Sequence, residues 1–269
     1  MNICAGNACV AACMLFSVLS LSGCGDRDKP ETLIAAGKEL LSKGEYRTAS
    51  LQFRNALEKS PDSPEARFLL GKALLEMPDP AGAEVELRRA RELRYPIDEV
   101  LPLLLRAQLA LGQNAKVIEE ASKAAVLSAS AKAVVQSRMA AAHLALGDRA
   151  AAGKAIDQAL LAQADNAEAL LLRSRLLAIS SDFDGALGVI AQIVAKDPRN
   201  FEAFALRGDV QRTKGNYFEA VESFDKAVEI RPEMTGARAA AISVLIAQSS
   251  QAKTAQIENA VKRFEVLKQ

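Results

Sequence analysis

Four cysteines and one histidine are the side chains in this sequence best suited to covalent or metal chemistry. All the cysteines lie near the N-terminus, at Cys4, Cys9, Cys13 and Cys24. A disulfide framework would distribute cysteines through the folded part, and a zinc site would combine them with histidines. The only histidine, His143, stands far from them in the sequence. We therefore predict no disulfide framework, no metal site and no cofactor.

Processing of the N-terminus explains the cysteines better. Residues 10–21 (VAACMLFSVLSL) form an apolar segment of the length of a signal-peptide core, too short to span a bilayer comfortably. Residues 21–24 (LSGC) resemble the bacterial lipobox, in which cleavage precedes the cysteine and its thiol carries diacylglycerol. The resemblance implies a lipoprotein signal peptide over residues 1–23, a lipid on Cys24 and a polar tether over residues 24–29.

The N-terminus departs from the usual signal peptide in one respect. No Lys or Arg precedes the apolar segment, although signal peptides usually begin with positive charge. A start codon placed too far downstream would explain the difference. The alternative interpretation is a buried or cytosolic apolar N-terminus.

Composition and motifs argue for a helical protein without catalytic machinery. Half of the residues are apolar, only 4% are aromatic, and the formal net charge is +1. This charge argues against a broad surface for nucleic acid, and the Ala- and Leu-rich texture favours helix throughout. The sequence contains no Walker loop, G-x-G-x-x-G, G-x-S-x-G or HExxH motif. We predict that the protein is not an enzyme and binds no nucleic acid.

Two segments of the same length repeat one another. Residues 30–63 and 201–234 align without gaps and share residues at regular positions. Among the shared pairs are Gly37/Gly208, Gly44/Gly215, Tyr46/Tyr217, Ala49/Ala220, Phe53/Phe224, Ala56/Ala227 and Pro61/Pro232. This length and spacing resemble the tetratricopeptide repeat (TPR). The resemblance implies an all-α solenoid, a right-handed superhelix of helix–turn–helix units.

When the register of these two segments is continued along the chain, it predicts seven repeats. Repeats start near residues 30, 64, 98, 133, 167, 201 and 235, so the solenoid covers residues 30–269. The first shared glycine is expected to let two helices approach closely, and the second to end the first helix of a repeat. The equivalent turns fall at Gly44, Pro78, Gly112, Gly147, Ser181, Gly215 and Ser249.

A row of cations forms the candidate binding site. In TPR proteins the second, fifth, ninth, twelfth and thirteenth positions of the first helix typically face the inner groove. Ninth positions hold the cations of what we call the basic ladder: Lys38, Lys72, Arg106 and Arg175. Phe68, at a fifth position, is expected to be an exposed apolar contact beside Lys72. An extended acidic peptide or an anionic polysaccharide could contact several of these cations, or they could be solvated residues that offset the glutamates at second positions.

Other charged residues are expected to be solvated. Arg88, Arg89, Arg91 and Arg94 lie on a second helix, and so on the outer face. The neighbouring carboxylates Glu119 and Glu120 are interpreted as a solvated helix face, and His143 as a packed side chain.

A closer resemblance covers the N-terminal repeats. Residues 65–113, together with the lipobox and residues 40–68, resemble the N-terminal part of the PEP-CTERM-system TPR-repeat lipoprotein (PrsT) family. The similarity is strongest over residues 24–113. Members of this family are encoded with exosortase protein-sorting and exopolysaccharide genes in Gram-negative bacteria, and most are several times longer. The resemblance implies a non-catalytic adaptor for protein partners or anionic exopolysaccharide in the cell envelope.

Two further expectations concern the partners and the membrane. The alternative function is a TPR lipoprotein scaffold that recruits peptidoglycan enzymes or pilus-assembly components. Gly25 follows Cys24 where an aspartate would favour retention in the inner membrane, so we expect a lipid-anchored protein that faces the periplasm from the outer membrane. Residues 236–247 are apolar almost all round, so the chain is a fragment or short paralogue, or its open end docks on a partner.

Overall fold

The computed structural model describes residues 29–125, 128–233 and 235–249. Over these ranges the chain forms thirteen α-helices and no strand, which confirms the predicted all-α fold. The helices are α1 (Pro30–Ser42), α2 (Tyr46–Lys59), α3 (Pro64–Glu76), α4 (Pro80–Glu92), α5 (Ile97–Ala110), α6 (Asn114–Lys123), α7 (Ala129–Ala145), α8 (Arg149–Ala162), α9 (Ala167–Ile179), α10 (Phe183–Lys196), α11 (Phe201–Lys214), α12 (Tyr217–Ile230) and α13 (Thr235–Ser249).

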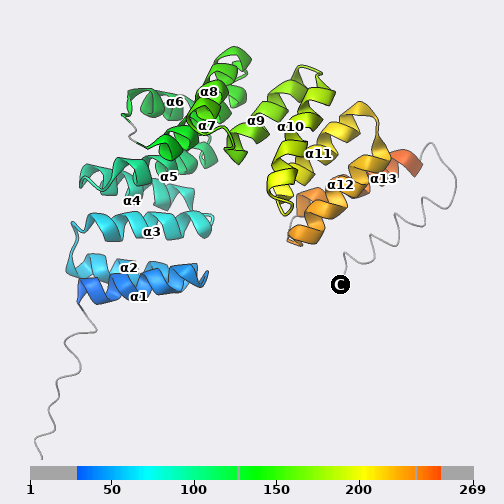
Figure 1. Cartoon of the computed structure of the whole chain (residues 1–269). Coiled ribbons are helices and arrows are strands. Elements are labelled where there is room, and N and C mark those ends of the chain that lie inside the picture. The colour runs from blue at the N-terminus through cyan, green and yellow to red at the C-terminus, as the bar shows by residue number, and fades with distance from the viewer. Residues whose placement is uncertain (1–28, 126–127, 234, 250–269) are drawn as a thin grey trace, which may run out of the picture.

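The helices stack as antiparallel pairs into an arch. One limb begins with α1 and α2, the other ends with α12 and α13, and α7 and α8 lie between the limbs (Figure 1). The backbones of consecutive odd-numbered helices approach one another from α1 to α11, whereas in the described part of the chain the backbones of consecutive even-numbered helices do not approach as closely. The odd-numbered helices are therefore closer together. They line the inner face of the curve, and the even-numbered helices line its outer face.

Size complementarity holds the two helices of a repeat together. A Cβ atom added to Gly37 would lie 2.4 Å from the ring of Phe53, and one added to Gly208 would lie 2.6 Å from the ring of Phe224. Both rings are almost completely buried. The missing side chain on one helix thus makes room for a large one on the other, as the sequence predicts.

Six of the seven predicted turns lie between the helices of a pair, whereas the seventh, at Ser249, falls on the last described residue of α13. Gly44, Gly112, Gly147, Ser181 and Gly215 have positive φ angles, between 64° and 88°. Ser181, with a φ of 64°, carries a Cβ in a conformation that favours glycine. Pro78 occupies the turn between α3 and α4.

The third and fourth repeats depart most from the predicted register. In the third, the sizes are exchanged, with buried Leu105 on the first helix and buried Ala121 on the second. The fourth begins earlier than residue 133, because the Ser128 side chain accepts a hydrogen bond of 3.1 Å from the Ala131 N–H and so caps α7.

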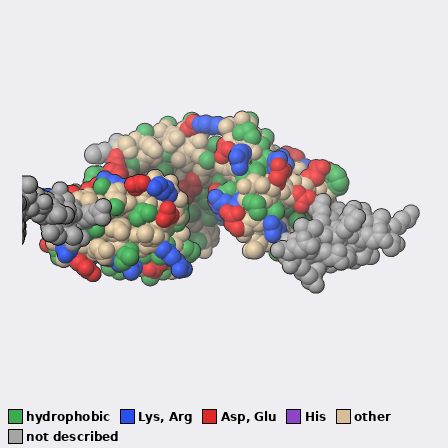
Figure 2. Space-filling model, turned by 90° about the horizontal axis from the view of Figure 1, so that it is seen from below, with side chains coloured by type: hydrophobic (Ala, Val, Ile, Leu, Met, Phe, Trp, Pro, Cys, Tyr) green, Lys and Arg blue, Asp and Glu red, His purple; other side chains and the backbone are tan. Residues whose placement is uncertain are grey.

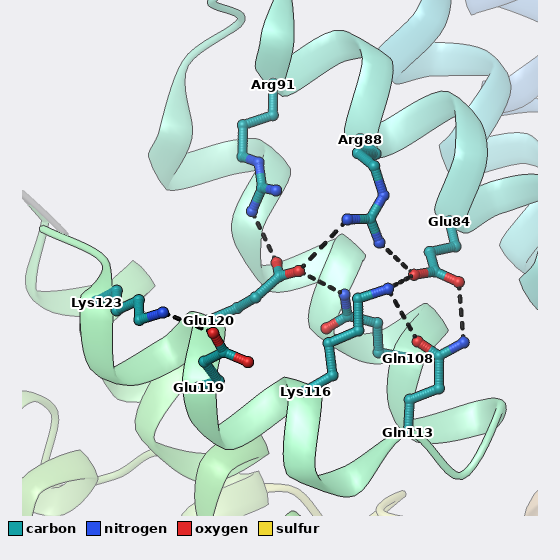
Figure 3. Close-up of polar contacts among 9 residues, drawn as sticks. All are labelled: Glu84, Arg88, Arg91, Gln108, Gln113, Lys116, Glu119, Glu120 and Lys123. Carbon is teal, nitrogen blue, oxygen red and sulfur yellow. Dashed lines mark hydrogen bonds and ion pairs between the residues drawn. The ribbon is translucent and has the colours of Figure 1, made fainter.

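A polar network joins the second and third repeats on the outer face (Figure 3). We call it the outer-face network. It consists of Glu84, Arg88 and Arg91 of α4, Gln108 of α5, and Gln113, Lys116 and Glu120 at α6. The expectation that these arginines and Glu120 are solvated is wrong. Glu120 has only 14% of its side chain exposed, because α4 and α6 approach each other through these groups rather than through apolar side chains.

The two acidic residues of this network accept most of its hydrogen bonds. Arg91 donates to Glu120 at 2.7 Å, and Gln108 donates to the same carboxylate at 3.0 Å. Glu84 accepts from Arg88, Lys116 and Gln113. Burial opposes ionisation of Glu84, but these hydrogen bonds outweigh it and lower the pKa of Glu84 below its usual value.

Several predicted features lie outside the described residues. These are the cysteines Cys4, Cys9, Cys13 and Cys24, the signal peptide over residues 1–23, all but the last residue of the tether, and the second helix of the seventh repeat. Within the described ranges, no helix has both the length and the apolar character needed to cross a membrane.

Candidate functional site

The inner face of the first three repeats carries an open groove of about 570 Å³. We call it the N-terminal groove. It lies along α1 and α3 and reaches the beginning of α5, and the side chains relevant to its chemistry are Lys38, Glu65, Phe68, Lys72, Tyr95 and Glu99. Three of the five predicted ligand-binding residues, Lys38, Phe68 and Lys72, therefore lie in one groove. Arg106 and Arg175 are not among the residues that line it.

An aromatic pair forms part of this groove. Phe68 and Tyr95 stack with their ring centroids 4.4 Å apart and an angle of 17° between the rings. Phe68 is only 6% exposed, so the prediction that it is an exposed contact is wrong. The reason is Tyr95, which comes from the segment between α4 and α5 and covers the Phe68 ring. Tyr95 itself remains partly exposed and presents the aromatic surface of the groove.

The hydroxyl group of Tyr95 lies in the negative part of the groove. Burial raises the pKa of Tyr95, and the negative charges of Glu99 and Glu65 and a hydrogen bond with Glu99 raise it further. Glu99 is exposed and lies in the first turn of α5, on the inner face. The Tyr95 end of the groove therefore favours positive charge in a ligand.

Only part of the basic ladder is available to bind an acidic ligand. Lys38 forms an ion pair with Glu65, and Arg106 forms one of 2.8 Å with Glu76. Lys72 and Arg175 are exposed, and neither has an ion-pair partner among the described residues. The ladder is thus no continuous basic stripe, since acidic residues of neighbouring helices neutralise two of its four cations. Viewed from below, both signs of charge are interspersed on the two limbs, and the molecule is hollowed between them (Figure 2).

A second charged cluster lies near the middle of the inner face. Arg138 of α7 forms an ion pair of 3.1 Å with Glu168 of α9. Burial raises the pKa of Glu168 and lowers the pKa of Arg138, and the charges of Arg106 and Glu202 also act on both groups. These four residues come from four consecutive odd-numbered helices, so this cluster connects the third repeat to the sixth.

In the described part of the chain we find no cluster of side chains suited to metal binding or to acid–base catalysis. No group of three or more His, Cys, Asp or Glu side chains in these ranges could hold a metal ion. His143 has 17% of its side chain exposed and lies 3.8 Å from the Asp148 carboxylate near the end of α7.

Two family comparisons identify the repeats. The family described as TPR repeat matches residues 37–77, and the family described as tetratricopeptide repeat matches residues 180–235. These segments lie in the first two repeats and in the fifth and sixth. The described helices form a TPR-type α-solenoid. TPR repeats are typical of scaffolds for protein–protein interaction, and TPR proteins are generally non-catalytic.

Solved structures share this fold at low sequence identity. The chain resembles one in the crystal structure of the APC/C hetero-tetramer Cut9–Hcn1, with a TM-score of 0.66, 14% identity and 82% of this chain covered. It spans only 44% of that protein's length. A tetratricopeptide repeat protein from Parabacteroides merdae matches with a TM-score of 0.59, 14% identity, and coverage of 87% of this chain and 98% of its own. Pseudomonas aeruginosa pilF matches with a TM-score of 0.57, 16% identity, and coverage of 76% and 92%.

These structural similarities establish the fold alone. The search of curated proteins found no match. The chemistry of the site therefore depends on the residues of this chain alone.

Sequence reasoning missed two contributors to the inner face. Tyr95 lies before α5, outside the helix positions that face the groove, and only the dipeptide Tyr95–Pro96 ahead of a helix signals it. Arg138 falls between the fifth and ninth positions of the fourth repeat, so the pattern used for the basic ladder passes over it.

Proposed function

We propose that this protein is a lipid-anchored, non-catalytic adaptor that faces the periplasm of a Gram-negative bacterium and captures an extended segment of a partner protein. The observation that carries the proposal is the N-terminal groove, which combines an aromatic surface with exposed charges of both signs. Such a mixture of apolar surface and a few polar groups is typical of binding sites.

The dimensions of the groove suit a peptide. Its volume of about 570 Å³ lies within the range of about 300–1,000 Å³ that is common for ligand pockets. Packed helices lie about 8–10 Å apart, and an extended chain advances about 3.3 Å per residue. A peptide that crosses from α1 to α5 would therefore place about six residues on the groove.

The anchor is supported by the N-terminal sequence. The lipobox-like LSGC and the confinement of all cysteines to residues 4–24 favour acylation of Cys24. Lipoprotein acylation supplies more than one chain, and two chains suffice for stable anchoring whereas one gives only marginal binding. Gly25 favours the outer membrane.

The cellular process is proposed from the closer resemblance. The sequence resemblance to the PEP-CTERM-system TPR-repeat lipoprotein family is strongest over residues 24–113, the same part of the chain that contains the N-terminal groove. We therefore place the adaptor in exosortase-linked protein sorting or exopolysaccharide export.

Site-specific crosslinking in native envelopes tests the adaptor. A photo-crosslinking residue replaces Leu41, which lines the groove, and in a matched control it replaces Leu161, which is 79% exposed on α8. We expect the groove position alone to capture a partner, identified by mass spectrometry as a sorting or exopolysaccharide-export protein. Wall hydrolases or pilus components would overturn the proposed process in favour of the alternative scaffold. No product at the groove position would overturn the adaptor itself.

Mass spectrometry of the native N-terminus tests the anchor separately. We expect a mature protein that begins with an acylated Cys24. An unmodified Cys24, or a mature protein that begins elsewhere, would overturn the lipid anchor.

A further inference from the structure

We infer that the N-terminal groove recognises a bipolar peptide segment, which places a basic side chain against Glu99 and an acidic group against Lys72 across the ring of Tyr95. This inference rests on the proposed function and adds the chemistry of the segment that the groove takes.

Two equivalent charge pairs on the inner face behave differently. Lys38 of α1 and Glu65 of α3 form an ion pair between neighbouring repeats. Lys72 and Glu99 occupy the same positions one repeat further along, on α3 and α5. Their charged atoms are not within the 4.0 Å of an ion pair, although both side chains are exposed and both line the N-terminal groove.

The aromatic pair lies in the part of the groove that this second charge pair lines. Tyr95 stacks on Phe68 and lines the same groove as Lys72 and Glu99. Lys72 has no ion-pair partner in the described ranges, and the carboxylate of Glu99 acts on Tyr95 rather than on a cation. The result is an aromatic surface with one exposed charge of each sign beside it.

The charges that line the groove disfavour a peptide segment with charges of one sign only. Two lysines, Lys38 and Lys72, and three glutamates, Glu65, Glu76 and Glu99, line it. An entirely acidic segment would be repelled by the glutamates, and an entirely basic one would meet Lys72. A segment with both charges complements each end, and an apolar or aromatic residue between them can pack on Tyr95.

The test measures binding of short fluorescent peptides to the full-length protein in detergent by fluorescence polarisation. One series carries a basic and an acidic residue separated by aromatic or apolar residues at varied spacing. Two further series of the same length are entirely acidic or entirely basic between the same apolar residues. We expect the bipolar series to bind best at one spacing, and to bind more weakly as salt is added.

Two substitutions assign the contacts. Lys72→Ser and Glu99→Gln are each expected to weaken binding of the best bipolar peptide about threefold to fivefold, because both contacts are exposed. Lys154→Ser and Glu58→Gln are the matched controls, since both residues are exposed on even-numbered helices, away from the groove. The controls are expected to leave binding unchanged. Circular dichroism verifies that all four variants are folded.

The outcomes separate this inference from the proposed function. Strongest binding by the acidic series would overturn the inference and support the basic ladder instead. Equal binding by the Lys72→Ser and Glu99→Gln variants and the parent would overturn it as well. If partner capture at Leu41 persists in those variants, the adaptor stands and the bipolar recognition fails. If bipolar peptides bind but no envelope partner is captured, the adaptor fails.

Discussion

The second and third repeats carry charged residues on both faces, but the two faces differ in whether these residues form ion pairs. On the outer face, every charged group of the outer-face network has a partner of opposite charge within the network. On the inner face of the same repeats, Lys72 is unpaired among the described residues and Glu99 interacts with a neutral tyrosine.

Burial explains the difference. Glu84 and Glu120 have 13% and 14% of their side chains exposed, so an unpaired charge at either position would be costly. Lys72 and Glu99 are exposed, and water stabilises their charges without an ion-pair partner among the described residues. The outer-face network thus contributes to the stability of the solenoid, whereas Lys72 and Glu99 on the inner face keep charges available to a ligand beside the ion pairs of Lys38 and Arg106.

The largest expected effect comes from removing the centre of the outer-face network. Glu120→Ala leaves Arg91, Arg88 and Gln108 without their shared acceptor. We expect the free energy of unfolding to fall by about 2–4 kcal/mol, measured by urea denaturation. Glu119→Ala is the control, since the Glu119 carboxylate is 62% exposed and its ion-pair partner in the described part of the chain is Lys123. Equal effects of both substitutions would contradict the distinction between buried and exposed charges.

A smaller effect is expected from the ion pair in the middle of the inner face. Arg138→Leu leaves the carboxylate of Glu168 without its partner and is expected to cost about 1–3 kcal/mol of unfolding free energy, since the pair is half-buried. The double variant Arg138→Leu/Glu168→Leu should recover most of this loss. A double variant as unstable as the single one would show that the ion pair is not the cause.

The pH dependence of this variant has a definite sign. The pKa of Glu168 is raised in the folded protein, and loss of Arg138 removes an influence that lowers it. Between the usual value of 4.5 and the raised pKa, the folded state binds more protons than the unfolded state. The unfolding free energy of Arg138→Leu is therefore expected to rise as the pH falls from neutral toward 4.5. Denaturation at a series of pH values measures it, and a fall relative to the parent would contradict the assignment.

Acid should weaken the outer-face network. The pKa of Glu84 is lowered in the folded protein, so its stabilisation is present above its usual pKa of 4.5 and is lost as the pH falls through the lowered value. We expect Glu84→Gln to lose stability less steeply than the parent below pH 4.5, as followed by circular dichroism. Parallel curves would show that Glu84 contributes nothing to the acid response.

The smallest expected effect distinguishes the paired lysine from the unpaired one. Lys38→Ser removes the ion pair with Glu65 and should cost up to about 1 kcal/mol of unfolding free energy. Lys72→Ser removes no ion pair and should leave the stability unchanged. Thermal unfolding measures both, and a larger loss for Lys72→Ser would show that this lysine has a structural role.

Much of the fold was predictable because each repeat makes the same local demands. A turn between antiparallel helices needs a positive φ angle, and this demand places Gly44 and Gly215 at equivalent positions. The close approach of two helices requires a residue without a side chain opposite a large ring, as at Gly37 and Phe53. Such steric demands are met by residue type, so they can be read from spacing.

The site was predictable only in part. The spacing brought Lys38, Lys72 and Phe68 to one groove, as expected for equivalent positions on neighbouring helices. It could not show that Phe68 is buried, because the residue that covers it, Tyr95, comes from a segment between helices that follows no repeat pattern.

The sequence by itself determined the helices, their pairing and the positions of the turns, because these depend on side chains close together along the chain. Only the tertiary structure decided which charges are satisfied. Lys38 and Lys72 have the same residue type and the same repeat position, yet one is paired and the other is not. Arg91 and Glu120 likewise become partners across two repeats. The pairing of a long charged side chain depends on what the neighbouring repeat places within its reach, and that is a property of the stacked helices.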